Sequence, residues 1–357
     1  MAIIVGAWGS LSGRIRPLGR VPAACRPSGA FVLAAAVVAS FVLALGACRR
    51  QAPLPAPAHP PLRLARLNWP GNYWVDVAQA CGLFAAEGLA AQLVDTTADY
   101  FGSLDDVVAG RLDANNFYVF DLVKRNLEGA DLVALIAADH GHGADGVVGR
   151  TGTLAGLRGR RVAVARGTFL EYLLHLALSR EKLTLGDVVQ VDVPPEKVQR
   201  AFERGDVDAA VTFEPMLSQL EKAGGRRLYD SSESPAGAFT GVWAVPRRLV
   251  ERRPEDLHAL VRTWERATRF IAENPGETSR LIAALYGQTP EEIERFMSLD
   301  RILGLRENRI AFTFATGYDS LHGSARRVNE FLVRTGQARA TLDTTSMIDA
   351  RFIRALP

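Results

Sequence analysis

The stretch LRGRRVAVARGTFLEYLLHLAL, residues 157–178, decides the fold class of this chain. An apolar run at residues 162–165 is broken by Arg166-Gly167-Thr168, and leucines then recur at helical spacing up to Leu178. This order predicts a strand, a glycine turn and a helix that Thr168 caps. The free N–H groups at the start of such a helix favour an anionic group, although an ordinary βα unit that binds nothing has the same pattern.

The first 47 residues have the features of a secretory signal. Four arginines are their only charged residues, and residues 30–45 are apolar except for Ser40. This run is shorter than the roughly 20 apolar residues that a membrane span needs, which argues against a spanning anchor. It ends in Leu45-Gly46-Ala47-Cys48, which resembles the bacterial lipobox, and the resemblance implies that Cys48 is acylated and becomes the first mature residue. Residues 48–61 are rich in Pro and Ala and predict an extended tether.

The charge balance of the chain changes once this segment is removed. The 357 residues have a formal charge of +3, but the first 47 contain four Arg and no acidic residue, so the remainder carries −1. The basic balance of the whole chain is therefore no reason to expect nucleic-acid binding. About 295 residues follow the tether, which is more than one typical core holds and predicts two domains.

Two segments that lie 95 positions apart share one order of residues. Gly110-Arg111-Leu112-Asp113-Ala114 and Gly205-Asp206-Val207-Asp208-Ala209 each follow a predicted helix and precede a short strand, a second helix and another strand. We interpret them as corresponding parts of two similarly wound α/β lobes. Beyond residue 245 the sequence predicts almost only helix, over residues 254–274, 275–286, 290–296, 321–335 and 347–356, with an irregular pass at 312–314.

Five short motifs occur along the chain in a specific order: GLFxxEGL at residues 82–89, GADGVV at 143–148, LRGRRVAV at 157–164, DVDAAV at 206–211 and Glu214-Pro215. Their order and spacing resemble the nitrate/sulfonate/taurine-type substrate-binding proteins of bacterial ABC importers, a family that also holds binders and synthases of the thiamine pyrimidine precursor. The resemblance implies a type II periplasmic-binding-protein fold, in which two doubly wound α/β lobes are joined by two crossover strands. The crossovers would lie near residues 146–150 and 240–245, with residues 62–150 and 245–357 in lobe 1 and residues 151–244 in lobe 2.

Ligands of such folds bind beyond the carboxyl ends of the strands, and family members use the loops found there. Thr168 and the helix behind it would hold an acidic group of the ligand. Glu214 would accept from an amine or a ring N–H, or else would only begin a helix, and the aromatic residues would stack on the ligand or pack in the core. The expected ligand-binding residues are Asn68, Trp69, Tyr73, Asp99, Tyr100, Asn115, Asn116, Phe117, Asp145, Arg166, Thr168, Phe169, Phe213, Glu214 and Thr240.

The run Asp139-His140-Gly141-His142, with Asp145 nearby, has the residue types of a zinc site. Its spacing fixes no third strong ligand, so we expect a hinge loop that lines the cleft rather than a metal site. The sequence has no Ser-His-Asp signature, no phosphate loop and no GxGxxG motif. We therefore expect no catalytic residue, no cofactor and no metal.

Together these features predict a monomeric, lipid-anchored solute receptor outside the cytoplasm, which passes a small-molecule ligand to the permease subunits of an ABC importer. Acidic residues at positions 99, 145 and 214 would repel a bare anion, which favours an organosulfonate, an aminosulfonate or an aminopyrimidine over nitrate. One alternative is an enzyme on the same fold that resembles the pyrimidine-precursor synthases, although the secretory signal argues against it. Another is a ligand-sensing module, for which the sequence offers no cytoplasmic domain.

Overall fold

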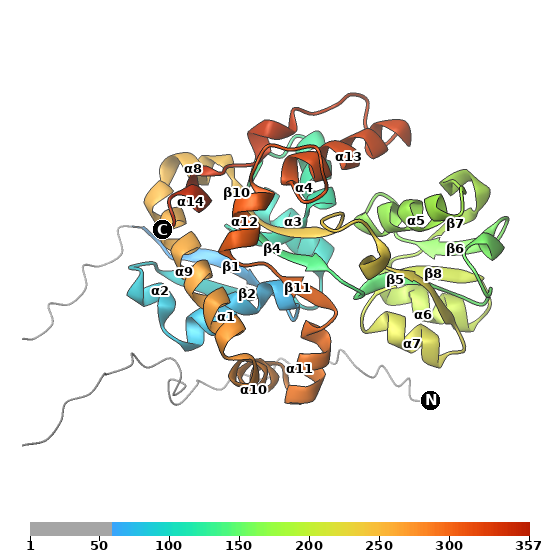
Figure 1. The fold of residues 1–357 in the computed structure, drawn as a ribbon, viewed down its shortest axis with the longest axis horizontal. Helices are drawn as coiled ribbons and strands as arrows, with labels where there is room; N and C mark the ends of the chain where they lie inside the picture. Colours follow the sequence, from blue (N-terminus) through green and yellow to red (C-terminus); the bar gives the residue numbers. More distant parts are fainter. Residues whose placement is uncertain (1–58) are drawn as a thin grey trace, which may run out of the picture.

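The computed structural model describes residues 59–357, and these form two lobes of unequal size (Figure 1). The predicted signal, Cys48 and residues 48–58 of the tether lie outside the described residues. Within residues 59–357, no helix combines the length and the apolar character that a membrane crossing requires.

Lobe 1 is built on strands from distant parts of the chain. Strands β11, β4, β10 and β3 are hydrogen-bonded in that order, and β1 pairs in parallel with β2. A bridge between Leu64 and Ala114 joins β1 to the residue that precedes β3. The strands are β1 (Leu62–Arg66), β2 (Ala91–Asp95), β3 (Asn115–Tyr118), β4 (Leu132–Gly141), β10 (Thr240–Pro246) and β11 (Asp300–Ile302).

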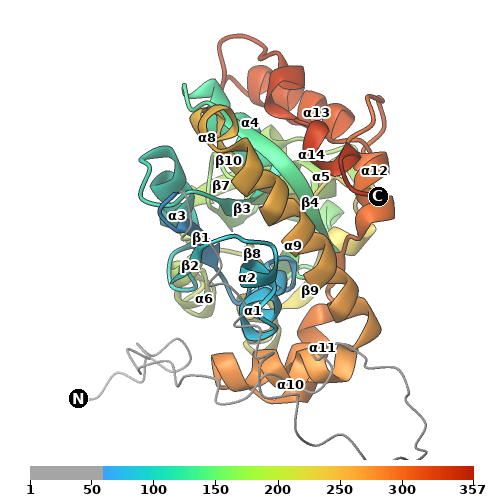
Figure 2. The same cartoon turned by 90° about the vertical axis from the view of Figure 1, so that its left-hand side faces the viewer.

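The longest helix of lobe 1, α9 (Pro254–Glu273), packs against α1 and α2 and is seen along its length in Figure 2. Pro254 starts it, and Leu257, Val261 and Trp264 are buried at the spacing of one helical face. The other helices of lobe 1 are α1 (Tyr73–Ala80), α2 (Leu83–Ala86), α3 (Tyr100–Val108), α4 (Val119–Leu127), α8 (Arg247–Arg252), α10 (Pro275–Tyr286), α11 (Pro290–Met297), α12 (Leu305–Ala311), α13 (Leu321–Arg334) and α14 (Arg351–Arg354).

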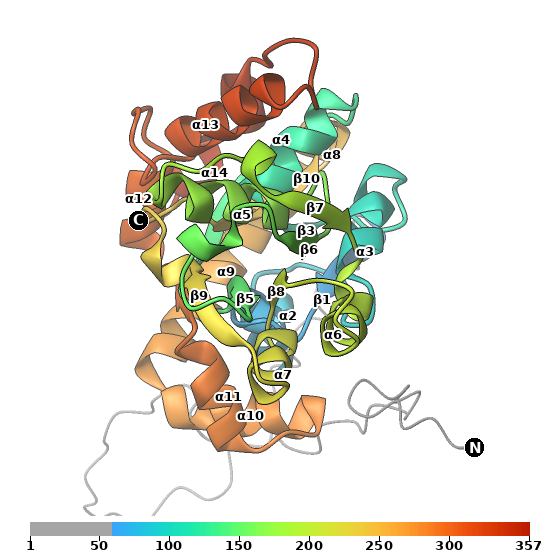
Figure 3. The same ribbon diagram turned by 90° about the vertical axis from the view of Figure 1, so that its right-hand side faces the viewer.

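Lobe 2 is a sheet in the order β7-β6-β8-β5-β9, with helices on both faces (Figure 3). Helix α5 (Phe169–Arg180) packs on one face, and α6 (Pro195–Glu203) and α7 (Met216–Lys222) cover the other, where Phe202 and Leu220 are fully buried. The predicted strand, glycine turn and helix at residues 157–178 are thus confirmed. The strands are β5 (Asp145–Gly149), β6 (Arg161–Val164), β7 (Val189–Asp192), β8 (Ala209–Phe213) and β9 (Arg226–Asp230).

The repeated motif of the sequence has the same set of bonds in both lobes. In lobe 1, the carboxylate of Asp113 accepts the backbone N–H of Arg63 at 2.8 Å and also its guanidinium, while Asp113 N–H donates to Arg63 O at 2.8 Å. In lobe 2, Asp208 makes the same contacts with Arg161, at 2.9 Å and 2.8 Å for the two backbone bonds. Each motif therefore fixes a strand beside the strand that follows the motif, β1 beside β3 in lobe 1 and β6 beside β8 in lobe 2, as expected for two similarly wound lobes.

Strand pairing moves both lobe boundaries from the positions expected from the sequence. β5 pairs with β8 and β9 and so belongs to lobe 2, whereas β10 pairs with β3 and β4 and so belongs to lobe 1. The chain crosses between the lobes at residues 142–144 and 231–239. Boundaries at 150/151 and 244/245 therefore assign one strand to the wrong lobe at each crossing, because the sequence of a buried strand does not reveal its pairing partners.

The region beyond residue 245 contains three elements that the sequence pattern did not predict, namely α8, β11 and α12. β11 has three residues, which is too short for a periodic pattern, and it pairs with the end of β4. Helix α12 precedes the segment 312–314, where Phe314 is 73% exposed. The predicted helix over 347–356 is shorter in the structure, because only Arg351–Arg354 is α-helical.

A buried ion pair joins β1, α1 and α10 in lobe 1. Arg66 Nε lies 2.6 Å from Asp76 Oδ1, and the side chains are 7% and 2% exposed. The hydroxyl of Tyr286 donates to Asp76 Oδ2 at 3.1 Å. Burial raises the pKa of Asp76 to about 6, and the Arg66 guanidinium opposes this shift.

We predict that Asp76→Asn lowers the free energy of unfolding by about 3–5 kcal/mol, because Arg66 would stay buried without a counter-charge. Urea denaturation measures this change. Asp131→Asn is the matched control: Asp131 pairs with Arg247 at 2.8 Å, but its side chain is 66% exposed. This control should lose less than about 1 kcal/mol, and equal losses in the two variants would contradict the prediction.

Candidate functional site

The two lobes meet through aromatic side chains near the carboxyl ends of their central strands. Tyr118 ends β3 in lobe 1, Phe169 begins α5 in lobe 2, and their ring centroids are 4.3 Å apart. The ring centroids of Phe101 and Phe213 lie 6.3 and 6.4 Å from that of Phe169. The Tyr118 hydroxyl also donates to Asp145 Oδ2 in β5 at 3.0 Å. The lobes are therefore in direct contact through these side chains.

Helix α5 makes a second set of contacts with lobe 1, through residues on adjacent turns. The ring of Phe331 in α13 lies 5.1 Å from Tyr172 and 5.0 Å from His175. Burial and the neighbouring Arg334 lower the pKa of His175 to about 4, so the imidazole is neutral at physiological pH. The polar contacts across this interface are Glu171–Gln337 (2.9 Å), Tyr172–Tyr318 (3.0 Å) and His175–Arg334 (2.9 Å).

An open pocket of about 290 Å³ lies at the edge of this contact. Lobe 1 contributes residues from α4 and from the segment after α13, and lobe 2 contributes the turn after β6, the first turn of α5 and the end of β7. The pocket therefore lies between the lobes, and its lining combines cations, carboxylates and an amide. The lining residues are Lys124, Arg166, Gly167, Glu171, Asp192 and Gln337.

The first turn of α5 satisfies its own polar groups. Thr168 Oγ1 accepts the N–H of Leu170 at 3.2 Å, which confirms the predicted cap, and the Thr168 hydroxyl donates to Ala165 O at 2.7 Å. Glu171 Oε2 accepts the Gly167 N–H at 2.9 Å. The expectation that Thr168 donates to an acidic ligand is therefore not met in this structure, because its hydroxyl already donates within the turn.

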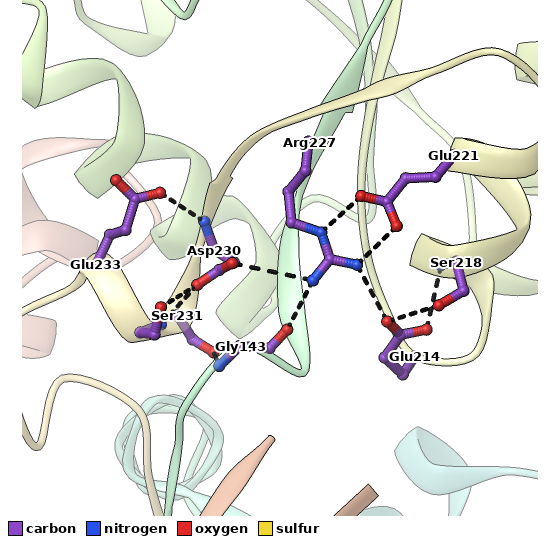
Figure 4. A network of polar contacts seen from close by, with 9 residues as sticks. Gly143, Glu214, Ser218, Glu221, Arg227, Asp230, Ser231 and Glu233 are labelled. Carbon is purple, nitrogen blue, oxygen red and sulfur yellow. Dashed lines mark hydrogen bonds and ion pairs between the residues drawn. The ribbon is translucent and has the colours of Figure 1, made fainter. Parts of the chain in front are cut away.

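Glu214 takes part in a network that fixes the first crossover (Figure 4). Its carboxylate is 5% exposed and accepts from Ser218 N–H at 3.1 Å, from Ser218 Oγ at 2.9 Å and from Arg227 Nη2 at 3.1 Å. Arg227 also pairs with Glu221 at 3.0 Å and donates to the carbonyl of Gly143 at 3.1 Å. Of the two roles considered for Glu214, the structure supports the start of a helix, here α7.

Three carboxyl groups are buried where the first crossover leaves lobe 1. Asp139 in β4 accepts from Trp69 Nε1 and Asn116 Nδ2, each at 3.0 Å. Burial raises the pKa of Asp145 to about 7, and burial together with the Asp139 carboxyl raises the pKa of Asp300 well above its usual range. Asp300 lies on the unpredicted strand β11 and pairs with Gly141 at the end of β4, so its place beside the first crossover does not follow from the sequence pattern.

Most of the remaining expected residues have roles inside lobe 1. Tyr73, Asn115 and Phe117 have no exposed surface, which contradicts their expected place on the cleft surface. Asp99 accepts the Gly102 N–H at 2.9 Å and so caps α3. Side-chain hydrogen bonds join Asn68 to Gln288, Tyr100 to Asp121 and Thr240 to the carbonyl of Gly237.

The segment 139–145 gives no metal geometry. Within residues 59–357, no group of three or more His, Cys, Asp or Glu side chains could hold a metal ion. His140 Nδ1 lies 2.9 Å from Thr240 Oγ1, and burial lowers the pKa of the imidazole to about 4, whereas His142 is exposed. This arrangement favours the hinge-loop interpretation of the segment.

Arg166, a ligand-binding residue expected from the sequence, lines the pocket, whereas Lys124, Glu171, Asp192 and Gln337 were not among the expected residues. Glu171 lies three residues after Thr168, which is the position from which an acidic side chain folds back onto a helix start. That spacing was visible in the sequence. Lys124, Asp192 and Gln337 come from segments far apart in the chain, and no local pattern marks them.

Comparison of the sequence with models of known protein families identifies a family. The model of the NMT1-like family matches residues 56–286, which is more than half of the chain.

The chain belongs to the NMT1-like family.

Several relatives of this NMT1-like protein are named as binding proteins. The taurine-binding periplasmic protein of Escherichia coli K12 is 28% identical over 274 residues, which cover 73% of this chain and 81% of that protein. A protein of Brucella abortus, which is named as a binding protein with no ligand specified, is 27% identical over 145 residues, or 39% of this chain. In that relative the match spans only 46% of the length.

Solved structures confirm the two-lobed periplasmic-binding-protein fold. The alkanesulfonate-binding protein SsuA of Xanthomonas axonopodis, bound to MOPS, has a TM-score of 0.66 at 17% identity, with 82% of this chain and 99% of that chain covered. The desulfurization enzyme DSZB has a TM-score of 0.58 at 17% identity, with 83% and 98% covered. Because binding proteins and an enzyme share the fold, it does not by itself define the activity.

We predict that Asp145 makes stability depend on pH. A buried carboxyl with a raised pKa stays protonated up to a higher pH in the folded chain than in the unfolded chain. Its contribution to the free energy of unfolding therefore falls as pH rises from about 4 to about 7. Asp145→Asn removes the carboxyl and with it this fall in the free energy of unfolding. The variant should therefore gain stability relative to the parent protein between about pH 5 and about pH 8, as urea denaturation would show. A constant difference at the two pH values would contradict the prediction, and Asp131→Asn is the exposed control.

Proposed function

We propose that this protein is an extracytoplasmic solute-binding protein of an ABC importer, which captures a small organic ligand of the sulfonate or taurine type between its lobes. The observation that carries the proposal is the pocket between the lobes, whose lining combines Lys124 and Arg166 with Glu171 and Asp192. A sulfonate is an anion with a small organic body, so a site for it needs cations and room for that body. The E. coli relative named as taurine-binding has the same kind of ligand.

The fold suits capture by closure. Two short crossovers, at residues 142–144 and 231–239, connect lobes that are otherwise separate sheets. Movement about such a pair of segments opens and closes the cleft, and a ligand that contacts both lobes stabilises the closed form. We assign the protein no catalytic role, because its relatives by sequence are named for binding. The permease subunits of the importer would be its partners.

Calorimetry on residues 59–357 tests the ligand class. We expect binding of taurine or a short alkanesulfonate and much weaker binding of nitrate. Lys124→Gln should weaken sulfonate binding by about 1.5–3 kcal/mol, as expected for the loss of a hydrogen bond to a charged group. Lys222→Gln, an exposed change outside the pocket lining, is the control. Tight nitrate binding, or no binding of any sulfonate, would refute the ligand class.

We also propose that Cys48 anchors the protein to a membrane as an acylated first residue, with residues 48–61 as the tether. Intact-mass measurement on protein extracted from membranes should show a chain that begins at Cys48 and carries acyl chains. An unmodified chain that begins before residue 48 would rule out the anchor.

A further inference from the structure

We propose that Glu171 makes the pocket bind ligands that carry an ammonium group beside their acidic group more tightly than ligands that carry the acidic group alone. This inference rests on the proposed function and adds to it the charge pattern of the ligand. Glu171 is a specificity-determining residue that the sequence-based list of ligand contacts did not include.

The position that an anion would take at the start of α5 already holds a carboxylate. Glu171 is buried, with 4% of its side chain exposed, and its Oε2 accepts the Gly167 N–H at 2.9 Å. The Leu170 N–H donates to Thr168 Oγ1 within the same turn. The positive end of the helix is therefore compensated from inside the chain. A ligand oxyanion brought to this turn would meet a negative charge.

Acceptor atoms remain for a donor-bearing ligand. Glu171 Oε1 forms an ion pair with Arg166, whose Nε lies 3.8 Å away, but this distance is beyond that of a hydrogen bond, so the oxygen can still accept one. Gln337 donates its amide N–H to Glu171 Oε2 from lobe 1, and its own Oε1 is buried without a hydrogen-bond partner in the described part of the chain. Asp192 adds a third acidic or amide oxygen at the end of β7. An ammonium group, with three donors and a positive charge, satisfies such a set.

Two cationic side chains at the pocket would bind the acidic group of the ligand. Lys124 comes from lobe 1 and Arg166 from lobe 2, and both line the same pocket as Glu171. The Lys124 ammonium also pairs with Glu128 at the end of α4, which leaves two of its three donors for a ligand. With two cations and two carboxylates, the lining has no net charge. It therefore offers little attraction to an ion of one sign, whereas a small zwitterion can contact both kinds of group.

The test compares taurine with ethanesulfonate, which has the same sulfonate and carbon chain but lacks the amine. Calorimetry on residues 59–357 gives the ratio of the two affinities for each variant. We expect the parent protein to bind taurine about tenfold or more tightly than ethanesulfonate, and Glu171→Gln to reduce that ratio about tenfold. Glutamine keeps the shape and still accepts the Gly167 N–H, so the variant changes mainly the charge.

Two further variants complete the design. Glu181→Gln removes an exposed carboxylate at the other end of α5 and should leave the ratio unchanged. Asp192→Asn, at the exposed end of β7, should reduce the ratio by less than Glu171→Gln, and it provides the test if Glu171→Gln does not fold.

The outcomes separate this inference from the function on which it rests. If both sulfonates bind the parent protein equally, or if the ratio survives both Glu171→Gln and Asp192→Asn, the inference is overturned while the sulfonate-binding function stands. If neither sulfonate binds, both are overturned.

Discussion

The exchange of one strand between the two sheets is the constraint on which the rest of this structure depends. β5 lies between β8 and β9 in lobe 2, and β10 lies between β3 and β4 in lobe 1, each antiparallel to its neighbours. Each exchanged strand is inside its sheet, so neither can leave without breaking hydrogen bonds on both sides. The chain must therefore cross twice, and the two crossings contact each other, because Gly143 N–H donates to Ser231 Oγ at 2.8 Å. Arg227, which contacts Gly143 and Glu214, fixes one of these crossings to lobe 2.

Local rules predicted the parts of this fold that depend on neighbouring residues. The strand, turn and helix at residues 157–178 follow from apolar spacing and a capping threonine, and the structure has them within two residues. The motif of Asp113 and Asp208 also predicted equivalent positions in the two lobes, because each carboxylate bonds to an arginine of the neighbouring strand, Arg63 in β1 and Arg161 in β6. The lobe boundaries could not be predicted in the same way. Whether Val147 pairs with Val211 or with a strand of lobe 1 depends on residues more than sixty positions away.

In the candidate site too, contacts within one turn could be predicted from the sequence, whereas contacts between distant segments could not. Thr168 is the cap that its sequence predicts, yet a local rule also places Glu171 over the same turn, and that acidic residue changes what the helix start can bind. Tyr73 and Phe117 were expected in the cleft because they follow predicted strands, but aromatic side chains in such positions are as readily buried in a core, and these two are. Gln337 and Lys124 reach the pocket only because α13 and α4 pack beside α5. No pattern within either segment reveals that contact.

The position of Glu171 couples ligand chemistry to the contact between the lobes. Its Oε2 atom holds Gly167 in lobe 2 and receives the amide of Gln337 from lobe 1, while the same α5 face joins lobe 1 through Tyr172 and His175. A ligand shifts the balance between open and closed forms only by the difference in its affinity for them. Contacts with Glu171 and Gln337 together exist only when the lobes meet. A group that binds both therefore favours the closed form, whereas one that repels Glu171 weakens the contact that closure requires. Glu171 would therefore both select the ligand and make the contact between the lobes depend on whether the ligand is bound.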